Sequence, residues 1–193
     1  MNKRIILASG SPRRKELLEK TGLIFEVVKS DYEEDMTLEL SPKKLAEHLS
    51  RGKAEDVAKK FTEGIIISAD TFISYEGKIM GKPHTPERAK EMLLSLSGRS
   101  HSVITGFTII DIESGKNISR AVETLIFFKE LSEKEIDEYV ATGNPLDKAG
   151  AYAIQVIGEK WVEKIEGDFD NVVGLPVKDL LEELKEFGVF VEL

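Results

Sequence analysis

Asp70 and the residues before it form the first candidate site. The apolar run Ile65–Ser68 predicts a buried strand, and Asp70 follows the predicted carboxyl end of that strand. In open α/β sheets ligands bind beyond the carboxyl ends of the strands, so an acid here is well placed to hold a metal ion or to act as a base. A lone aspartate in such a place is more commonly a turn residue that binds its own backbone. The position alone leaves both interpretations open.

Arg13 and Arg14 lie in the first turn of a helix predicted over Pro12–Thr21, directly after the small-residue turn Ser9–Ser11. Helix N-termini present free N–H groups and the positive end of the helix dipole, which suit phosphate, and arginine can grip phosphate oxygens with two parallel hydrogen bonds. Two cations in a first turn oppose the dipole unless an anion compensates. An ordinary Ser-Pro helix start with two solvated arginines is the equally weighted alternative.

Two lysines lie at positions where a phosphate ligand would account for a positive charge. A helix is predicted from Ser41 to about Phe61, and its apolar stripe contains Leu45, Leu49, Lys53 and Val57. Lys53 must therefore extend to water, pair with a carboxylate or meet a ligand anion, and extension to water is the ordinary outcome. Lys82 lies in the tight turn Gly81–Pro83.

Two further segments could contribute a base-recognition group or metal ligands. Small residues crowd the segment Asn144–Gln155, as they would where backbone lines a pocket, and the amide of Gln155 can both donate and accept hydrogen bonds on a base edge. A tightly packed turn is the alternative. An acidic cluster is either a solvated loop or a source of carboxylates for a divalent ion; it contains Asp31, Glu33, Glu34 and Asp35.

The elements that must position these residues alternate between helix and strand, which predicts an α/β protein with a mixed sheet. The predicted strands are Lys3–Ala8, Ile24–Lys29, Ile65–Ser68, Phe72–Tyr75, Lys78–Met80, His101–Asp111, Asn117–Lys129, Ala151–Val156, Trp161–Glu166 and an edge strand at Val189–Leu193. Besides the two helices above, we predict helices from Thr85 to near Gly98, from Ser132 to Gly143 and from Pro176 to Gly188. No linker-like stretch interrupts residues 1–193, so we expect one domain.

Composition excludes several classes of function. The 193 residues are 41% apolar and 32% charged, with a net charge of −8, which disfavours nucleic-acid binding. There is no cysteine and no histidine pair at metal-ligand spacing, so a metal ion would sit on carboxylates, which suits Mg²⁺ or Mn²⁺. The apolar run near the N-terminus is too short for a signal or a membrane span, so we expect a cytoplasmic protein without a membrane partner. P-loop, dinucleotide-binding and nucleophile-elbow motifs are absent from the sequence.

Seven segments, in order along the chain, resemble the motifs of the Maf family, known as septum-formation inhibitors and nucleoside triphosphate pyrophosphatases. They are LASGSPRRKELL at 7–18, GKA at 52–54, SADT at 68–71, GKP at 81–83, MLLSLSGRSHSVITG at 92–106, DKAGAYAIQ at 147–155 and GDFDNVVGLP at 167–176. No single segment is decisive, but the joint match is highly specific. The resemblance implies an α/β fold like that of the inosine triphosphate pyrophosphatases, with a mixed sheet flanked by helices and two lobes around a deep cleft.

The resemblance also implies roles for individual residues. Asp70 matches the proton acceptor, and Arg13, Thr71 and Gln155 match positions that set substrate choice. Ser9, Arg14, Lys53 and Lys82 match polar positions on the phosphate side of the cleft. Glu34 matches an acidic position that, with Asp70, would hold the divalent cation, although the adjacent Glu33 could take the same place.

The implied reaction is attack of water on a nucleoside triphosphate, giving the monophosphate and pyrophosphate with the help of Mg²⁺ or Mn²⁺. Thr71 with Gln155 resembles the branch that acts on dTTP and UTP, with modified pyrimidine nucleotides as further candidates and a role in cell-division arrest. Two alternatives stay open: a pyrophosphatase for another modified nucleotide, and a regulatory nucleotide-binding protein that inhibits septum formation without turnover. The expected partner is the triphosphate substrate, and a homodimer remains one option for the oligomeric state.

Overall fold

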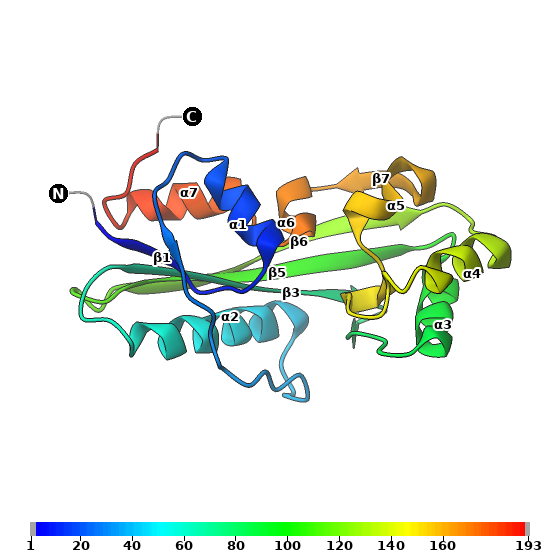
Figure 1. The fold of residues 1–193 in the computed structure, drawn as a ribbon, viewed down its shortest axis with the longest axis horizontal. Coiled ribbons are helices and arrows are strands. Elements are labelled where there is room, and N and C mark those ends of the chain that lie inside the picture. Colours follow the sequence, from blue (N-terminus) through cyan, green and yellow to red (C-terminus); the bar gives the residue numbers. More distant parts are fainter. Residues whose placement is uncertain (1–2, 192–193) are drawn as a thin grey trace. The chain divides into compact units, whose positions relative to one another are not determined.

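The computed structural model describes residues 3–191 and has an α/β fold built on one mixed sheet (Figure 1). The sheet has the strand order β2-β1-β3-β5-β6-β7, with β4 paired to β3. Its strands are β1 (Ile5–Leu7), β2 (Glu26–Val27), β3 (Ile65–Tyr75), β4 (Lys78–Met80), β5 (Ser100–Asp111), β6 (Asn117–Phe128) and β7 (Val162–Glu166). β1 is parallel to β2 and β3, whereas β4 and β7 are antiparallel to β3 and β6. The predicted mixed sheet is therefore confirmed.

Seven α-helices and a 3₁₀ turn are found in the described part of the chain. They are α1 (Pro12–Glu19), α2 (Pro42–Ala58), α3 (Pro86–Leu96), α4 (Glu133–Ala141), the 3₁₀ turn η1 (Ala149–Ala151), α5 (Ile154–Trp161), α6 (Phe169–Val173) and α7 (Val177–Lys185). None of the helices within residues 3–191 combines the length and the apolar character that a membrane crossing requires.

The chain forms two compact units, each assembled from separate segments. Unit 1 consists of Met1–Asp70, Thr105–Val122 and Gly174–Leu193, and unit 2 consists of Thr71–Ile104 and Glu123–Val173. The strands β3, β5 and β6 each contribute residues to both units. The chain passes from unit 1 to unit 2 directly after Asp70.

Unit 1 is layered, with α2 on one face of its strands and α1 and α7 on the other (Figure 1). Apolar residues of β1, β3 and α2 form a fully buried cluster that includes Ile6, Ile66 and Val57. α2 lies so close to β5 that a Cβ atom on Gly106 would be 2.1 Å from the carbonyl oxygen of Ala46, so only glycine fits there. Close packing on this face brings the polar groups of α2 within reach of the sheet.

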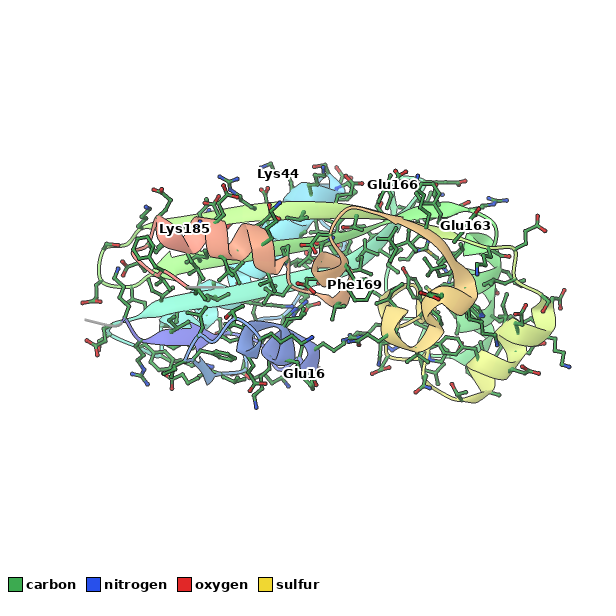
Figure 2. The ribbon with its side chains drawn as sticks, turned by 90° about the horizontal axis from the view of Figure 1, so that it is seen from above. Glu16, Lys44, Glu163, Glu166, Phe169 and Lys185 are labelled. Atoms are coloured by element: carbon green, nitrogen blue, oxygen red, sulfur yellow. The ribbon has the colours of Figure 1, made fainter. Side chains whose placement is uncertain are left out.

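The helices α2 and α7 of unit 1 are amphipathic, as their sequences predict. Leu45 and Leu49 of α2 are fully buried, whereas charged side chains cover the outward faces of the helices. Examples are Glu16 on α1, Lys44 on α2 and Lys185 on α7 (Figure 2). Lys53 is therefore an exception on the buried face of α2, and its environment needs a specific explanation.

In unit 2, α3 contacts α4 and η1, and α5 contacts β7 and α6. The segments around Lys82 and before Gln155 are joined by backbone hydrogen bonds. His84 N donates to Leu146 O at 3.2 Å, and Gly150 N donates to Gly81 O at 3.1 Å.

Four predicted strands are corrected. Ile65–Ser68 and Phe72–Tyr75 are parts of one strand, β3, so Asp70 lies inside a strand and does not follow its end. Ala151–Val156 is also wrong as a strand, because α5 begins at Ile154 and buries Ile154, Ile157 and Trp161 at helical spacing. Residues 189–191 are not in a strand; the rest of the predicted edge strand Val189–Leu193 lies outside the described residues. The short helix α6 was not predicted.

Candidate active site

Asp70 is positioned by the register between β3 and α2. Side chains two residues apart on a strand share a face, so Ser68 and Asp70 both point toward α2. Ser68 Oγ donates to Ser50 O at 2.6 Å, and Asp70 Oδ1 accepts from Lys53 Nζ at 2.5 Å. Ser50 and Lys53 are three residues apart and therefore neighbours on the helix. The polar residues that interrupt the apolar run of β3 thus find partners on α2, which is why the strand continues through them.

Lys53 connects two carboxylates. Its Nζ lies 2.7 Å from Glu34 Oε1 as well as 2.5 Å from Asp70 Oδ1. The side chains of Lys53 and Asp70 are only 13% and 9% exposed, whereas that of Glu34 is 44% exposed. Of the outcomes considered for a lysine on an apolar helix face, pairing with carboxylates is the one observed. We call Glu34, Lys53 and Asp70 the charge cluster.

The acidic residues before α2 have different partners. Glu34, rather than its neighbour Glu33, reaches Lys53. Asp31 pairs with Lys60 at 3.0 Å, and the carboxylate of Asp35 accepts hydrogen bonds from Thr37. Those bonds lower the pKa of Asp35, with the Thr37 hydroxyl as the main cause. Only one of the four acids thus joins the charge cluster.

Arg14 links the turn before α1 to the segment before α7. Its Nε donates to Gly174 O at 2.8 Å, and one of its terminal nitrogens lies 3.4 Å from Ser9 Oγ. Desolvation lowers the pKa of Arg14, while the negative charges of Asp70 and Glu34 act in the opposite direction. Arg14 therefore lies in the electric field of the charge cluster. Gly174 as its partner was not foreseen, although the segment 167–176 was among the matched motifs.

Arg13 is half-buried and forms no hydrogen bond or ion pair with any residue in 3–191. The first turn of α1 contains no acidic residue, and the N-cap Ser11 makes no side-chain cap. The Oγ of Ser9 instead accepts from Ser11 N at 3.2 Å. The Arg13 guanidinium at the start of α1 is thus available to an anion.

The remaining predicted site residues belong to unit 2. Thr71 follows Asp70 in β3, and Lys82 is exposed beyond β4. Lys82 forms no salt bridge within the described ranges, but its charge adds to that of Lys148 in lowering the pKa of Asp147; Lys148 is the main cause. Gln155 is exposed in the first turn of α5.

A buried aromatic frame holds both ends of α5. We use this name for His101, Phe128, Tyr139, Tyr152 and Trp161, whose rings pack edge to face with centroids 4.8–6.3 Å apart. His101 Nε2 lies 2.6 Å from the Tyr152 hydroxyl, and Tyr139 Oη accepts from Ala153 N at 3.3 Å. At the other end, Trp161 O accepts from Lys129 N at 2.9 Å. These contacts lie within three residues of Gln155 at one end, and none was predicted.

Burial keeps the frame uncharged. Desolvation lowers the pKa of His101 to about 4 and raises the pKa of Tyr152. His101 is therefore neutral near pH 7. The sequence marks Tyr152 only as part of the matched segment 147–155, and His101 only as part of the segment 92–106.

The structure brings the predicted residues of unit 1 together around the charge cluster and the α1 turn. Among residues 3–191, no three histidine, aspartate or glutamate side chains gather in a way that would hold a metal ion. However, Glu34 and Asp70 converge on one positive charge, the Lys53 ammonium. Carboxylate oxygens arranged in this way suit a hard divalent cation, so the two residues fit such a group in donor type. The site combines two carboxylates with several cations, a combination suited to phosphoryl chemistry.

Comparison with known proteins matches nearly the whole chain, including every candidate site residue, to one family. The family model described as "Maf-like protein" matches residues 4–187. A dTTP/UTP pyrophosphatase from Methanosarcina mazei is 50% identical over 98% of this chain and 96% of its own length. Proteins of the same name from Methanococcoides burtonii and Bacillus cereus are 52% and 48% identical over 98% of this chain, covering 97% and 92% of their own lengths.

Among solved structures, the Staphylococcus aureus Ham1 protein is similar in fold. It aligns with a TM-score of 0.53 and 15% sequence identity, over 97% of this chain and 100% of its own. At this identity the likeness concerns the fold alone. It supports the assignment of the mixed sheet flanked by helices.

Proposed function

The chain belongs to the Maf family, and we propose that it hydrolyses dTTP and UTP to the monophosphate and pyrophosphate. The family model runs through both units, and relatives with this activity in their names are about half identical over nearly the full length. The observation that supports the proposal most is the charge cluster, because the Asp70 carboxylate lies 2.5 Å from the mostly buried Lys53 ammonium. We further propose that residues 1–193 act as one Maf-like domain in the cytoplasm, where nucleoside triphosphates are found.

Asp70 is the base in this proposal. Lys53 binds Oδ1 and keeps the carboxylate in place, so that Oδ2 is the atom that receives the proton from the attacking water. Burial of both side chains within α2 and β3 limits their motion, which favours a well-defined direction of attack.

The triphosphate needs positive charge on the protein. Arg13 at the start of α1 is available to phosphate oxygens, the helix dipole favours an anion there, and Ser9 and Arg14 shape that turn. We assign Lys82 to the same task from its match to the family motif and from its exposure. Thr71 and Gln155 are assigned to recognition of the pyrimidine base, since the Gln155 amide can pair with both donors and acceptors.

Glu34 and Asp70 would hold a divalent cation, Mg²⁺ or Mn²⁺. Bound there, the ion would neutralise phosphate charge and lower the pKa of water. The support is the donor type and the convergence of the two carboxylates on the Lys53 ammonium.

A substrate panel tests the proposal. The protein is incubated with dTTP, UTP, CTP, GTP, 7-methyl-GTP and modified pyrimidine triphosphates, with Mg²⁺ or Mn²⁺, and pyrophosphate and monophosphate are quantified. We expect one pyrophosphate per monophosphate, with dTTP and UTP preferred. Activity confined to another nucleotide would contradict the roles of Thr71 and Gln155. Nucleotide binding without any product would favour the regulatory binding protein.

A further inference from the structure

We infer that Tyr32 and Gly52 are positioning residues for Glu34: the Tyr32 ring docks on the bare backbone of α2 at Gly52 and thereby holds the Glu34 carboxylate at the charge cluster. The inference rests on the proposed role of Glu34 in cation binding. It concerns the segment 30–34, which precedes α2 in the chain and returns to lie on that helix.

Gly52 is the first line of evidence. A Cβ atom at this position would lie 2.3 Å from Cζ of Tyr32 and 2.5 and 2.7 Å from its two Cε atoms. No real side chain tolerates such distances, so the ring occupies the space that any residue other than glycine would need. Glycine is unfavourable inside a helix, and this contact gives a reason for it in the middle of α2.

The second line of evidence is a docking stripe on α2. His48, Gly52 and Asp56 are spaced by four residues and form one row along α2, and Lys60 continues this spacing in the turn just after the helix end. Asp56 Oδ2 accepts from Ser30 Oγ at 2.8 Å and from Asp31 N at 2.9 Å. Lys60 pairs with Asp31 at 3.0 Å, and the Tyr32 hydroxyl lies 3.4 Å from His48 Nε2. Every member of the row therefore contacts the segment 30–32.

The segment is also ordered internally. Ser30 Oγ, which donates to Asp56, accepts from Tyr32 N at 3.0 Å. The two hydrogen bonds to Asp56 lower the pKa of its carboxyl, the backbone N–H of Asp31 having the larger effect, and so keep it ionised as an acceptor.

Glu34 has little else to hold it. Its side chain is 44% exposed, and its one salt bridge within residues 3–191 is to Lys53. It lies two residues beyond Tyr32, and one residue spans at most about 3.5 Å of extended chain. Docking of Tyr32 therefore restricts Glu34 to the neighbourhood of Lys53. Without the docked ring, one partly exposed ion pair would have to offset the entropy that the segment loses when it becomes ordered.

The test compares Gly52→Ala and Tyr32→Ala with Glu34→Gln and wild type. Arg51→Ala is the matched control on α2, because Arg51 contacts Glu55 and Asn117 and lies outside the docking stripe. We expect both docking variants to weaken Mn²⁺ binding, measured without nucleotide by electron paramagnetic resonance, by about tenfold. Hydrogen exchange of residues 30–34 should be faster in both, and kcat for dTTP should fall by a similar factor.

Two further measurements distinguish the positioning role, whose expected results follow, from a purely structural role. Alanine favours helix more than glycine, so Gly52→Ala should leave the thermal unfolding temperature near that of wild type while Mn²⁺ binding weakens. The double variant Gly52→Ala/Tyr32→Ala should be no worse than either single variant, because both remove the same contact.

The outcomes separate the inference from the function on which it rests. Wild-type Mn²⁺ binding and exchange in Tyr32→Ala would overturn the positioning role, whatever Gly52→Ala does to folding, provided that Glu34→Gln is impaired. If Glu34→Gln itself binds Mn²⁺ and turns over dTTP like wild type, the proposed role of Glu34 fails, and the inference fails with it.

Discussion

In unit 1 the candidate catalytic side chains are partners of one another, whereas in unit 2 the candidate recognition residue is held by groups that do no chemistry. Lys53 binds both Glu34 and Asp70, so the charged side chains of the cluster hold one another, and the docked Tyr32 ring supports only Glu34 from outside the cluster. Gln155 is exposed, and the aromatic frame beneath its segment sets where it lies. The ion pairs of the charge cluster would change when a charged ligand binds. The aromatic frame is uncharged and closely packed, so it would not.

The difference suits two different tasks, catalysis in unit 1 and base recognition in unit 2. Charged groups in a catalytic site must exchange partners when a triphosphate and its cation arrive, so a network of ion pairs is suitable there. A recognition group has to keep its place to distinguish similar bases, and a close-packed aromatic core provides that constancy. Variants that alter only the charge cluster or only the aromatic frame test this difference.

After the loss of Asp70 itself, the largest effect is expected from Lys53→Met. It removes the shared counter-charge and leaves the Asp70 and Glu34 carboxylates without the group that holds both of them. We expect kcat/KM for dTTP to fall by about 10²-fold. Lys44→Met is the control, because Lys44 pairs with Glu47 on the outer side of α2 (Figure 2). Steady-state kinetics of both variants provide the measurement, and a Lys53→Met enzyme within twofold of the control would contradict the self-positioning cluster.

The pH dependence of stability tests the neutral frame. The pKa of His101 is about 4 in the folded protein and 6.5 in the reference state, so the unfolded chain binds the extra proton between these values. The contribution of neutral His101 is therefore complete above about pH 6.5 and is lost as pH falls toward 4, by at most about 3 kcal/mol.

Chemical unfolding at several pH values measures this contribution. The decrease in unfolding free energy between pH 6.5 and 4 should be smaller in His101→Gln than in wild type, whatever the absolute stability of the variant. Parallel curves for the two proteins would mean that His101 is not buried as a neutral ring.

A smaller effect is expected at the turn before α5. Gly150 and Gly143 both have positive φ, at 64° and 73°, but a Cβ on Gly150 would lie 2.3 Å from Cδ1 of the buried Ile73, whereas Gly143 faces open space. Gly150→Ala should therefore cost about 2 kcal/mol more than Gly143→Ala, since both share the backbone penalty. Thermal unfolding of the pair measures the difference, and equal losses would show that the segment is loosely packed.

The residue types at the candidate site were predictable from the sequence, whereas the groups that surround them were not. The Ser-Pro start of α1, the hairpin of β3 and β4 and the amphipathic α2 were predictable, because capping, turn and periodicity signals are local. The polar residues inside β3 looked like the end of a strand, because the partners that satisfy them lie on α2, 17 or 18 residues earlier in the chain. Local patterns do not record such pairings.

The candidate site shows the same limit. Lys53 could be singled out as an anomaly, but only the packed structure selects its carboxylate partners. The contacts Arg14–Gly174, Tyr32–Gly52 and His101–Tyr152 join residues 20 to 160 positions apart. Tertiary packing creates these contacts, and a single sequence carries no signal for which partner is chosen.

The most direct test of the account is turnover by Asp70→Asn. Asparagine keeps the shape of the side chain and an oxygen that can accept from Lys53, but it cannot take a proton from water. We predict that kcat for pyrophosphate release from dTTP falls by about 10²–10⁴-fold, while dTTP binding, measured by calorimetry, stays within a few-fold of wild type. Near-normal turnover in this variant would contradict the assignment of Asp70 as the base.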